Sequence, residues 1–122
     1  MRTCCFVTVA MLVAAAAMGA DAPAAKPLKV LVVTGGHGFE EAPFIEMWKS
    51  FKNIEFTHLP QKEGGAAFAS VADWPYDVVV LYNFNQQISE KEAANFTALM
   101  DKGVGLVINH HAVAAYPDWP EY

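Results

Sequence analysis

The chain has 122 residues, of which 54% are hydrophobic, and its thirteen acidic and eight basic residues give a net charge of −5. This length suits one domain rather than two. Lysine and arginine form no cluster, so the composition excludes a nucleic-acid partner held through its phosphates. A neutral or cationic small molecule, or a metal ion, agrees better with the acidic balance.

Residues 1–20 have the pattern of a secretory signal peptide. Arg2 gives the start a positive charge, an apolar segment follows, and small residues come at its end. The apolar run is short for a membrane span, which needs roughly 20 residues, so we expect cleavage and no stable membrane span afterwards. An uncleaved anchor is the alternative. The prediction is a periplasmic or secreted protein with a linker at 21–27 and one domain at 28–122.

Both cysteines, Cys4 and Cys5, lie inside the predicted signal. The rest of the chain then has no disulfide, no thiolate nucleophile and no cysteine ligand for a metal. It keeps seven basic and thirteen acidic residues, a net charge of −6. The domain must therefore depend on its apolar core for stability.

The periodicity of apolar residues predicts four strands and two helices in the order β-α-β-β-α-β. The strands are expected at 28–34, 53–59, 76–83 and 104–109, and the helices at 40–51 and 89–103. In the second helix, Ser89 and Glu92 match a capping box and Gly103 matches a helix stop.

The strands at 28–34, 76–83 and 104–109 are too apolar to be half-solvated, which indicates a parallel sheet covered on both faces. We expect an α/β fold, a flavodoxin-like three-layer sandwich with strand order 2-1-3-4. A doubly wound sheet usually continues past four strands, so the chain is interpreted as the N-terminal part of a longer domain.

Residues 63–70 are small and predict a flexible loop. His58, on the weaker second strand, is expected to be solvated, and Trp74 and Tyr76 are expected to pack on the core or its rim.

In an open parallel sheet, ligands bind beyond the carboxyl ends of the strands, near the point where the strand order reverses. Three loops should meet there, and each holds polar side chains directly after an apolar run. They are 34–41, 82–87 and 109–119. Asn83 and Asn109 are predicted to bind substrate at this edge.

The first of these loops contains Gly35-Gly36-His37-Gly38. It is either a plain strand-to-helix turn or a site where Gly36 and Gly38 offer backbone N–H groups, at the helix start, to an anion or a sugar hydroxyl. Neither the dinucleotide fingerprint nor the P-loop pattern fits. A histidine at a strand end favours a ligand-binding or catalytic role for His37.

His110 and His111 follow the last strand. Strand alternation would send them to opposite faces, whereas a sharp turn would bring both to the binding edge. We expect at least one to act as a general acid or base near neutral pH. The alternative is that one caps the strand and the other packs into the helix layer.

A divalent metal, zinc first, is a further hypothesis, with His37, His110 and His111 as ligands and Glu40, Glu41 or Asp118 completing the set. The spacing matches no compact metal motif.

At the chain's end, residues 116–122 combine aromatic rings, prolines and carboxylates. This stretch predicts either a sugar stacked on Trp119 or a loop that Trp119 packs on the core.

Several stretches, KVLVVTGGHGFE, YDVVVLYNF, ISEKEAANFTALMDKGVGLVINHHA and WPEY, resemble the ThuA-like family, named for trehalose utilisation. That family has the class I glutamine amidotransferase-like fold. The resemblance runs from about Lys29 to the last residue, and its most specific parts are the Gly-Gly-His-Gly turn and the His-His-Ala after the last strand.

The resemblance implies a role in carbohydrate metabolism, with processing of oxidised glycosides or disaccharides. The expected reaction is hydrolytic cleavage or lyase-type elimination on a glycoside, in which an imidazole of near-neutral pKa moves a proton. It implies that His37, His110 and His111 line the pocket and that some members hold a divalent metal. The amidotransferases carry a nucleophilic cysteine where this chain reads Asn109-His110-His111-Ala112, so thiol chemistry on glutamine is excluded. A non-catalytic carbohydrate-binding module is the alternative, and the oligomeric state stays open.

Overall fold

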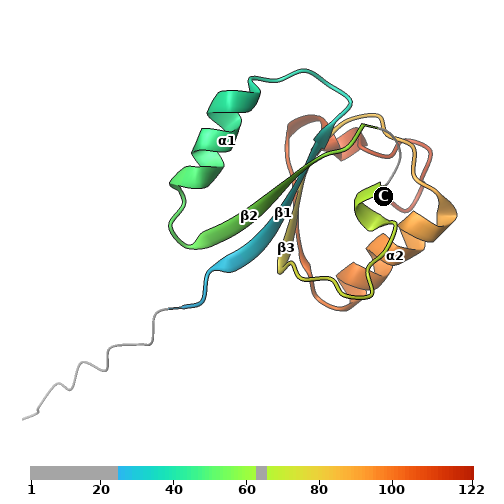
Figure 1. Cartoon of the computed structure of the whole chain (residues 1–122). Helices are drawn as coiled ribbons and strands as arrows, with labels where there is room; N and C mark the ends of the chain where they lie inside the picture. The colour runs from blue at the N-terminus through green and yellow to red at the C-terminus, as the bar shows by residue number, and fades with distance from the viewer. Residues whose placement is uncertain (1–24, 63–65) are drawn as a thin grey trace, which may run out of the picture.

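Four parallel strands form one sheet with a helix on each face (Figure 1). The computed structural model describes residues 25–62 and 66–122, so the predicted signal at 1–20 and the start of the linker lie outside the described residues. The strands are β1 (Leu28–Gly35), β2 (Ile54–Pro60), β3 (Val78–Asn83) and β4 (Gly105–Ile108). The helices are α1 (Glu41–Ser50) and α2 (Glu90–Asp101), with two short 3-10 helices, η1 (Ala66–Phe68) and η2 (His110–Ala114).

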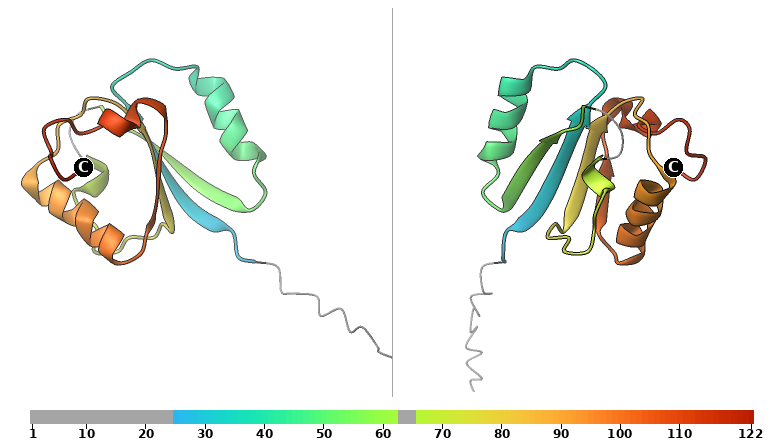
Figure 2. Two further views of the ribbon diagram at one scale, coloured as in Figure 1. Left: turned by 180° about the vertical axis from the view of Figure 1, so that it is seen from behind. Right: turned by 45° about the vertical axis from the view of Figure 1, so that its right-hand side comes forward.

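The strand order is β2-β1-β3-β4, which confirms the predicted flavodoxin-like order. Every neighbouring pair is parallel, so the carboxyl ends of all four strands lie at one end of the sheet. The chain leaves β1 toward β2 on one side and later returns to β3 on the other. Figure 2 shows the result: α1 and α2 cover opposite faces, and the β1–α1 connection and η2 lie at the same end of the sheet.

Alternation along the strands divides the apolar residues between two cores. On the α1 face, Val30, Val32 and Val80 are buried, and Phe44 and Trp48 of α1 pack against them. The core on the α2 face is larger. Its buried members come from β1, β3, η1, α2 and the segment after β4: Leu31, Val33, Ala67, Phe68, Val79, Leu81, Phe96, Leu99, Ala112, Ala115 and Tyr116.

The two helices are held to different extents. α2 begins with the predicted capping box, in which the Ser89 Oγ accepts from the Glu92 N–H and the Glu92 carboxylate accepts from the Ser89 N–H. It buries Phe96 and Leu99. α1 has no side-chain cap and no fully buried residue, and Met47 and Phe51 are 44% and 42% exposed.

Three local predictions were wrong. The last strand was expected to be buried, yet Val107 and Ile108 are 47% and 41% exposed, because β4 is the edge strand of the described sheet. His58 was expected to be solvated, but its side chain is only 14% exposed and its Nε2 lies 2.8 Å from the Thr34 Oγ1. Within the expected flexible loop, Phe68 is fully buried in η1 because the α2-face core needs a large ring there.

In the described part of the chain, neither α1 nor α2 combines the length and the apolar character that crossing a bilayer would require.

Candidate functional site

The three histidines singled out in the sequence lie together at the carboxyl end of the sheet. The ring centroid of His37 is 5.3 Å from that of His111 and 6.2 Å from that of His110. The rings of His110 and His111 are 3.8 Å apart. We call these three residues the histidine rim. His110 and His111 are exposed and His37 is half-buried, so solvent and small molecules can reach the rim.

His37 is held by the backbone on both sides of its ring. Its Nε2 lies 3.1 Å from the carbonyl oxygen of Tyr82, and its Nδ1 lies 3.2 Å from the carbonyl oxygen of Gly38. A carbonyl oxygen only accepts, so at least one of these nitrogens carries a hydrogen and donates it. The contact with Tyr82 joins the loop after β1 to the end of β3 and fixes the ring toward η2.

A sharp turn at His110 explains how two consecutive histidines reach the same edge. His110 has φ of +55°, in the left-handed region that a side chain other than glycine rarely adopts. The turn leads directly into η2, whose first two residues are His110 and His111. Strand alternation therefore ends at Asn109, and both imidazoles project toward His37. Of the two arrangements left open by the sequence, the structure has the sharp turn.

η2 is attached to the neighbouring loop by backbone hydrogen bonds. The N–H of Asn85 donates to the carbonyl of Ala114 at 3.1 Å, and the N–H of Gln86 donates to that of Ala115 at 2.6 Å. The phenol of Tyr122 donates to the carbonyl of Ala112. These bonds fix the position of the two histidines relative to β3.

Aromatic rings surround the histidine rim. Tyr82 lies edge-on to His37 with centroids 4.8 Å apart, and Phe84 lies 5.4 Å from His111. Phe39 and Phe44 flank Tyr82 on its other sides, at 5.4 and 5.0 Å. None of these rings was predicted as part of the site, although the positions of Phe39, Tyr82 and Phe84 next to Gly38 and Asn83 could have indicated them. They give the rim apolar surfaces on which a ligand ring can stack.

Two glycines of the first loop, Gly36 and Gly38, differ in how closely they are packed. A Cβ added to Gly36, which has φ of +78°, would lie 1.7 Å from the carbonyl oxygen of Phe84. A Cβ added to Gly38 would meet no other atom within 4 Å. α1 begins only at Glu41, so these glycines precede the helix instead of forming its first turn, contrary to the expectation of N–H groups at a helix start. Close packing of Gly36 brings the loops after β1 and β3 together.

The other predicted binding residues do not all join the rim. Asn109 does: it is exposed and directly precedes η2. Asn83 is fully buried, and its amide donates to the Tyr116 hydroxyl at 3.2 Å. Trp119 packs edge-on against Phe96 of α2, with centroids 5.4 Å apart, which agrees with the alternative of a loop packed on the core.

Electrostatics favour the neutral form of His111. Partial loss of hydration lowers the pKa of His111 from its ordinary value, and the nearby imidazoles of His110 and His37 lower it further. The neutral form is the one that can accept a proton. Burial raises the pKa of Tyr116 to about 12, so this phenol stays neutral beside Asn83.

The described residues do not by themselves complete a zinc site. Both nitrogens of His37 face carbonyl oxygens, which leaves two imidazoles, whereas zinc needs three or four ligands. Glu41 lies near His58, at 3.9 Å from its Nδ1, and Asp118 accepts from Gln87. In residues 25–62 and 66–122, no group of three or more His, Cys, Asp or Glu side chains is placed to hold a metal ion.

The fold and the site define an α/β sandwich of the flavodoxin type with an imidazole cluster at its strand-order reversal. Among solved structures, the chain is similar to a protein named as ThuA-like from Parabacteroides merdae ATCC 43184, with a TM-score of 0.62 and 23% sequence identity. The similarity covers 79% of this chain and 37% of that protein, so this chain spans little more than a third of its length. No protein-family model and no curated protein matches the chain.

Proposed function

We propose that this chain is a ThuA-like domain that acts in carbohydrate metabolism through imidazole acid–base chemistry on oxidised glycosides. The structural similarity to a protein named as ThuA-like supports the family, together with the motifs in the sequence. One observation carries the chemistry: His37, from the loop after β1, faces His110 and His111, from the loop after β4, at ring distances of 5.3 to 6.2 Å.

The proposed reaction is an elimination. An oxidised sugar ring carries a carbonyl, which makes the neighbouring C–H bond acidic. A base removes that proton, a C=C bond forms, and the C–O bond to the leaving group breaks. The proton then passes to the leaving oxygen. One imidazole with a pKa near neutrality can perform both transfers.

His111 is the proposed base, because its lowered pKa favours the neutral, proton-accepting form and its side chain is exposed. His110, with its ring 3.8 Å away, is proposed to relay the proton. Both nitrogens of His37 face the carbonyls of Gly38 and Tyr82, so His37 is proposed to orient the substrate through contact with its ring. The exposed ring of Phe84 and the amide of Asn109 are proposed to contact the sugar.

The test is turnover of a ketone-bearing p-nitrophenyl glycoside and of its unoxidised parent by the purified full chain. His111→Gln should lower kcat by about 100- to 10,000-fold, the usual contribution of a general base. His58→Gln is the matched control, since His58 bonds to Thr34 and not to the rim, and it should leave kcat unchanged. Equal kcat for wild type and His111→Gln would contradict the role of His111.

A non-catalytic carbohydrate-binding site is the second candidate, favoured by the rings of Tyr82 and Phe84 beside the histidines. Such a site needs stacking surfaces and hydrogen bonds but no titrating base. Sugar binding by calorimetry, with no turnover of either glycoside, would establish this candidate in place of the enzyme.

Two further proposals concern the whole protein. Elemental analysis after purification tests the zinc hypothesis, and a stoichiometric transition metal would show that ligands beyond the described residues complete the site.

Export to the periplasm or medium is proposed from the charged and apolar pattern of residues 1–20. Fractionation of cells followed by N-terminal sequencing tests it, and an intact N-terminus in the cytoplasmic fraction would contradict it.

A further inference from the structure

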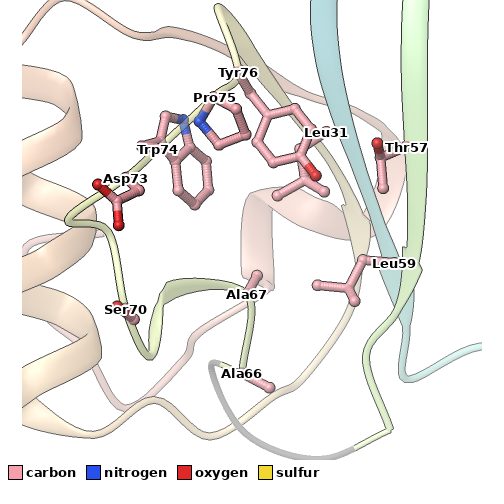
Figure 3. A pocket seen from close by; sticks show the side chains of 10 residues that line it. All are labelled: Leu31, Thr57, Leu59, Ala66, Ala67, Ser70, Asp73, Trp74, Pro75 and Tyr76. Atoms are coloured by element: carbon pink, nitrogen blue, oxygen red, sulfur yellow. The ribbon is translucent and has the colours of Figure 1, made fainter.

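A pocket lies away from the histidine rim and has a chemistry of its own. Its volume is about 310 Å³, and its walls come from β1, β2, η1 and the segment before β3 (Figure 3). The ten residues that line it are Leu31, Thr57, Leu59, Ala66, Ala67, Ser70, Asp73, Trp74, Pro75 and Tyr76. None belongs to the rim. Trp74 and Tyr76 precede β3, whereas His111 follows β4, so the two sites can be tested separately.

The base of this pocket is aliphatic. Leu31 and Ala67 belong to the buried core on the α2 face, and Leu59 packs against that core. Figure 3 shows Leu31 and Leu59 reaching in from the sheet, and Ala67 from η1. These groups cannot form hydrogen bonds, so a ligand with hydroxyl groups on every side would lose hydrogen bonds to water here. The base suits methyl and methylene groups.

Two aromatic rings form a corner beside this aliphatic surface. The rings of Trp74 and Tyr76 have centroids 5.3 Å apart and an interplanar angle of 75°. Phe68 stacks against Trp74 and holds its position. Aromatic rings at such an angle attract a cation through their π systems, and quaternary ammonium groups are the ligands most often bound in this way.

Among the described residues that line the pocket, Asp73 alone carries a charge, a carboxylate. Within the described residues Asp73 forms no ion pair, so its charge is available to a ligand. The chain as a whole has a net charge of −5, which also favours the approach of a cation. Thr57 and Ser70 add hydroxyl groups for one polar substituent of the ligand.

We propose that this pocket binds a small organic cation of the quaternary ammonium class, with its methyl groups on Leu31 and Leu59, its charge beside Asp73, and the rings of Trp74 and Tyr76 around it. This site is separate from the proposed chemistry at the histidine rim. Loss of one function therefore does not imply loss of the other.

The experiment is calorimetric titration of the full chain with choline, and with 3,3-dimethyl-1-butanol, which has the same shape without the charge. Choline should bind about tenfold more tightly, the equivalent of about 1.4 kcal/mol. NMR shifts of the tryptophan indole N–H groups in the same titration should include the Trp74 signal, assigned with Trp74→Phe.

Asp73→Asn should weaken choline binding about three- to tenfold, and the exposed Asp101→Asn, at the end of α2, should not change it. Because Asp73 is exposed, this variant leaves the core intact. Equal affinity for the neutral alcohol, an unchanged affinity in Asp73→Asn, or a response to methyl glucoside in place of choline would each overturn the proposal. So would the absence of saturable choline binding.

Discussion

Because the backbone at His110 is left-handed, we expect the glycine variant at this position to be more stable than the alanine variant, the reverse of the usual order. An L-residue in the left-handed region costs about 1–2 kcal/mol, whereas glycine adopts it freely. Glycine loses about 0.5–1 kcal/mol relative to alanine through greater freedom in the unfolded chain. Since φ at His110 is +55°, His110→Gly should be more stable than His110→Ala by about 0.5–1 kcal/mol.

Both variants lose the same imidazole, so their difference isolates the backbone. The assay is urea denaturation of both proteins, with thermal melting as a second measurement, in which 1 kcal/mol corresponds to a shift of about 4–8 °C for a domain of this size. Val113 is the matched control. It lies in the same short helix, is 75% exposed and is not among the positive-φ residues.

At Val113 the order should be the ordinary one, with alanine more stable than glycine. If His110→Ala proves as stable as His110→Gly, the left-handed turn does not exist in solution. The explanation for the convergence of the two imidazoles would then be wrong.

Three other predictions follow from the site. Folding lowers the pKa of His111 from 6.5, so the unfolded chain binds the proton more readily than the folded protein does. The free energy of unfolding should therefore be at its full value above pH 6.5 and should fall as the pH drops below 6.5. His111→Gln should weaken this pH dependence in denaturation curves. The Cβ of Gly36→Ala would lie 1.7 Å from a carbonyl oxygen, so this variant should lose at least about 2 kcal/mol of unfolding free energy. Gly38 has open space around it, so Gly38→Ala should lose less than about 0.5 kcal/mol. Similar losses in the two variants would contradict the close packing of Gly36. Tyr116→Phe removes the hydroxyl partner of the buried Asn83 amide and should cost about 1–3 kcal/mol, measured by urea denaturation against Tyr76→Phe as the control.

The elements were predictable because their signals are local. Apolar β-branched runs indicated the strands, and Ser89 and Glu92 indicated the start of α2, each through residues close together in the chain. The strand order followed from the apolar character of the strands and from the rule for doubly wound sheets. The boundaries of the elements differ from expectation by a few residues only.

The errors concern contacts between distant residues. His58 and Thr34 are neighbours only because β1 and β2 pair, and nothing near His58 in the sequence indicates that hydroxyl. Phe68 lies in a segment of small residues and is buried because Phe96 and Trp74 approach it from other elements. Asn83 faces Tyr116 instead of the rim because strand alternation places its side chain on the α2 face.

The sequence by itself determined which residues form strands and helices and that His37, His110 and His111 follow strand ends, since these properties depend on the order of neighbouring residues. Only the tertiary structure decided that the three imidazoles meet, because their distances depend on the turn at His110, on the packing of Gly36 against the loop after β3, and on the bonds that attach η2 to that loop. Each of these is an interaction between chain segments that come together only when the sheet has formed.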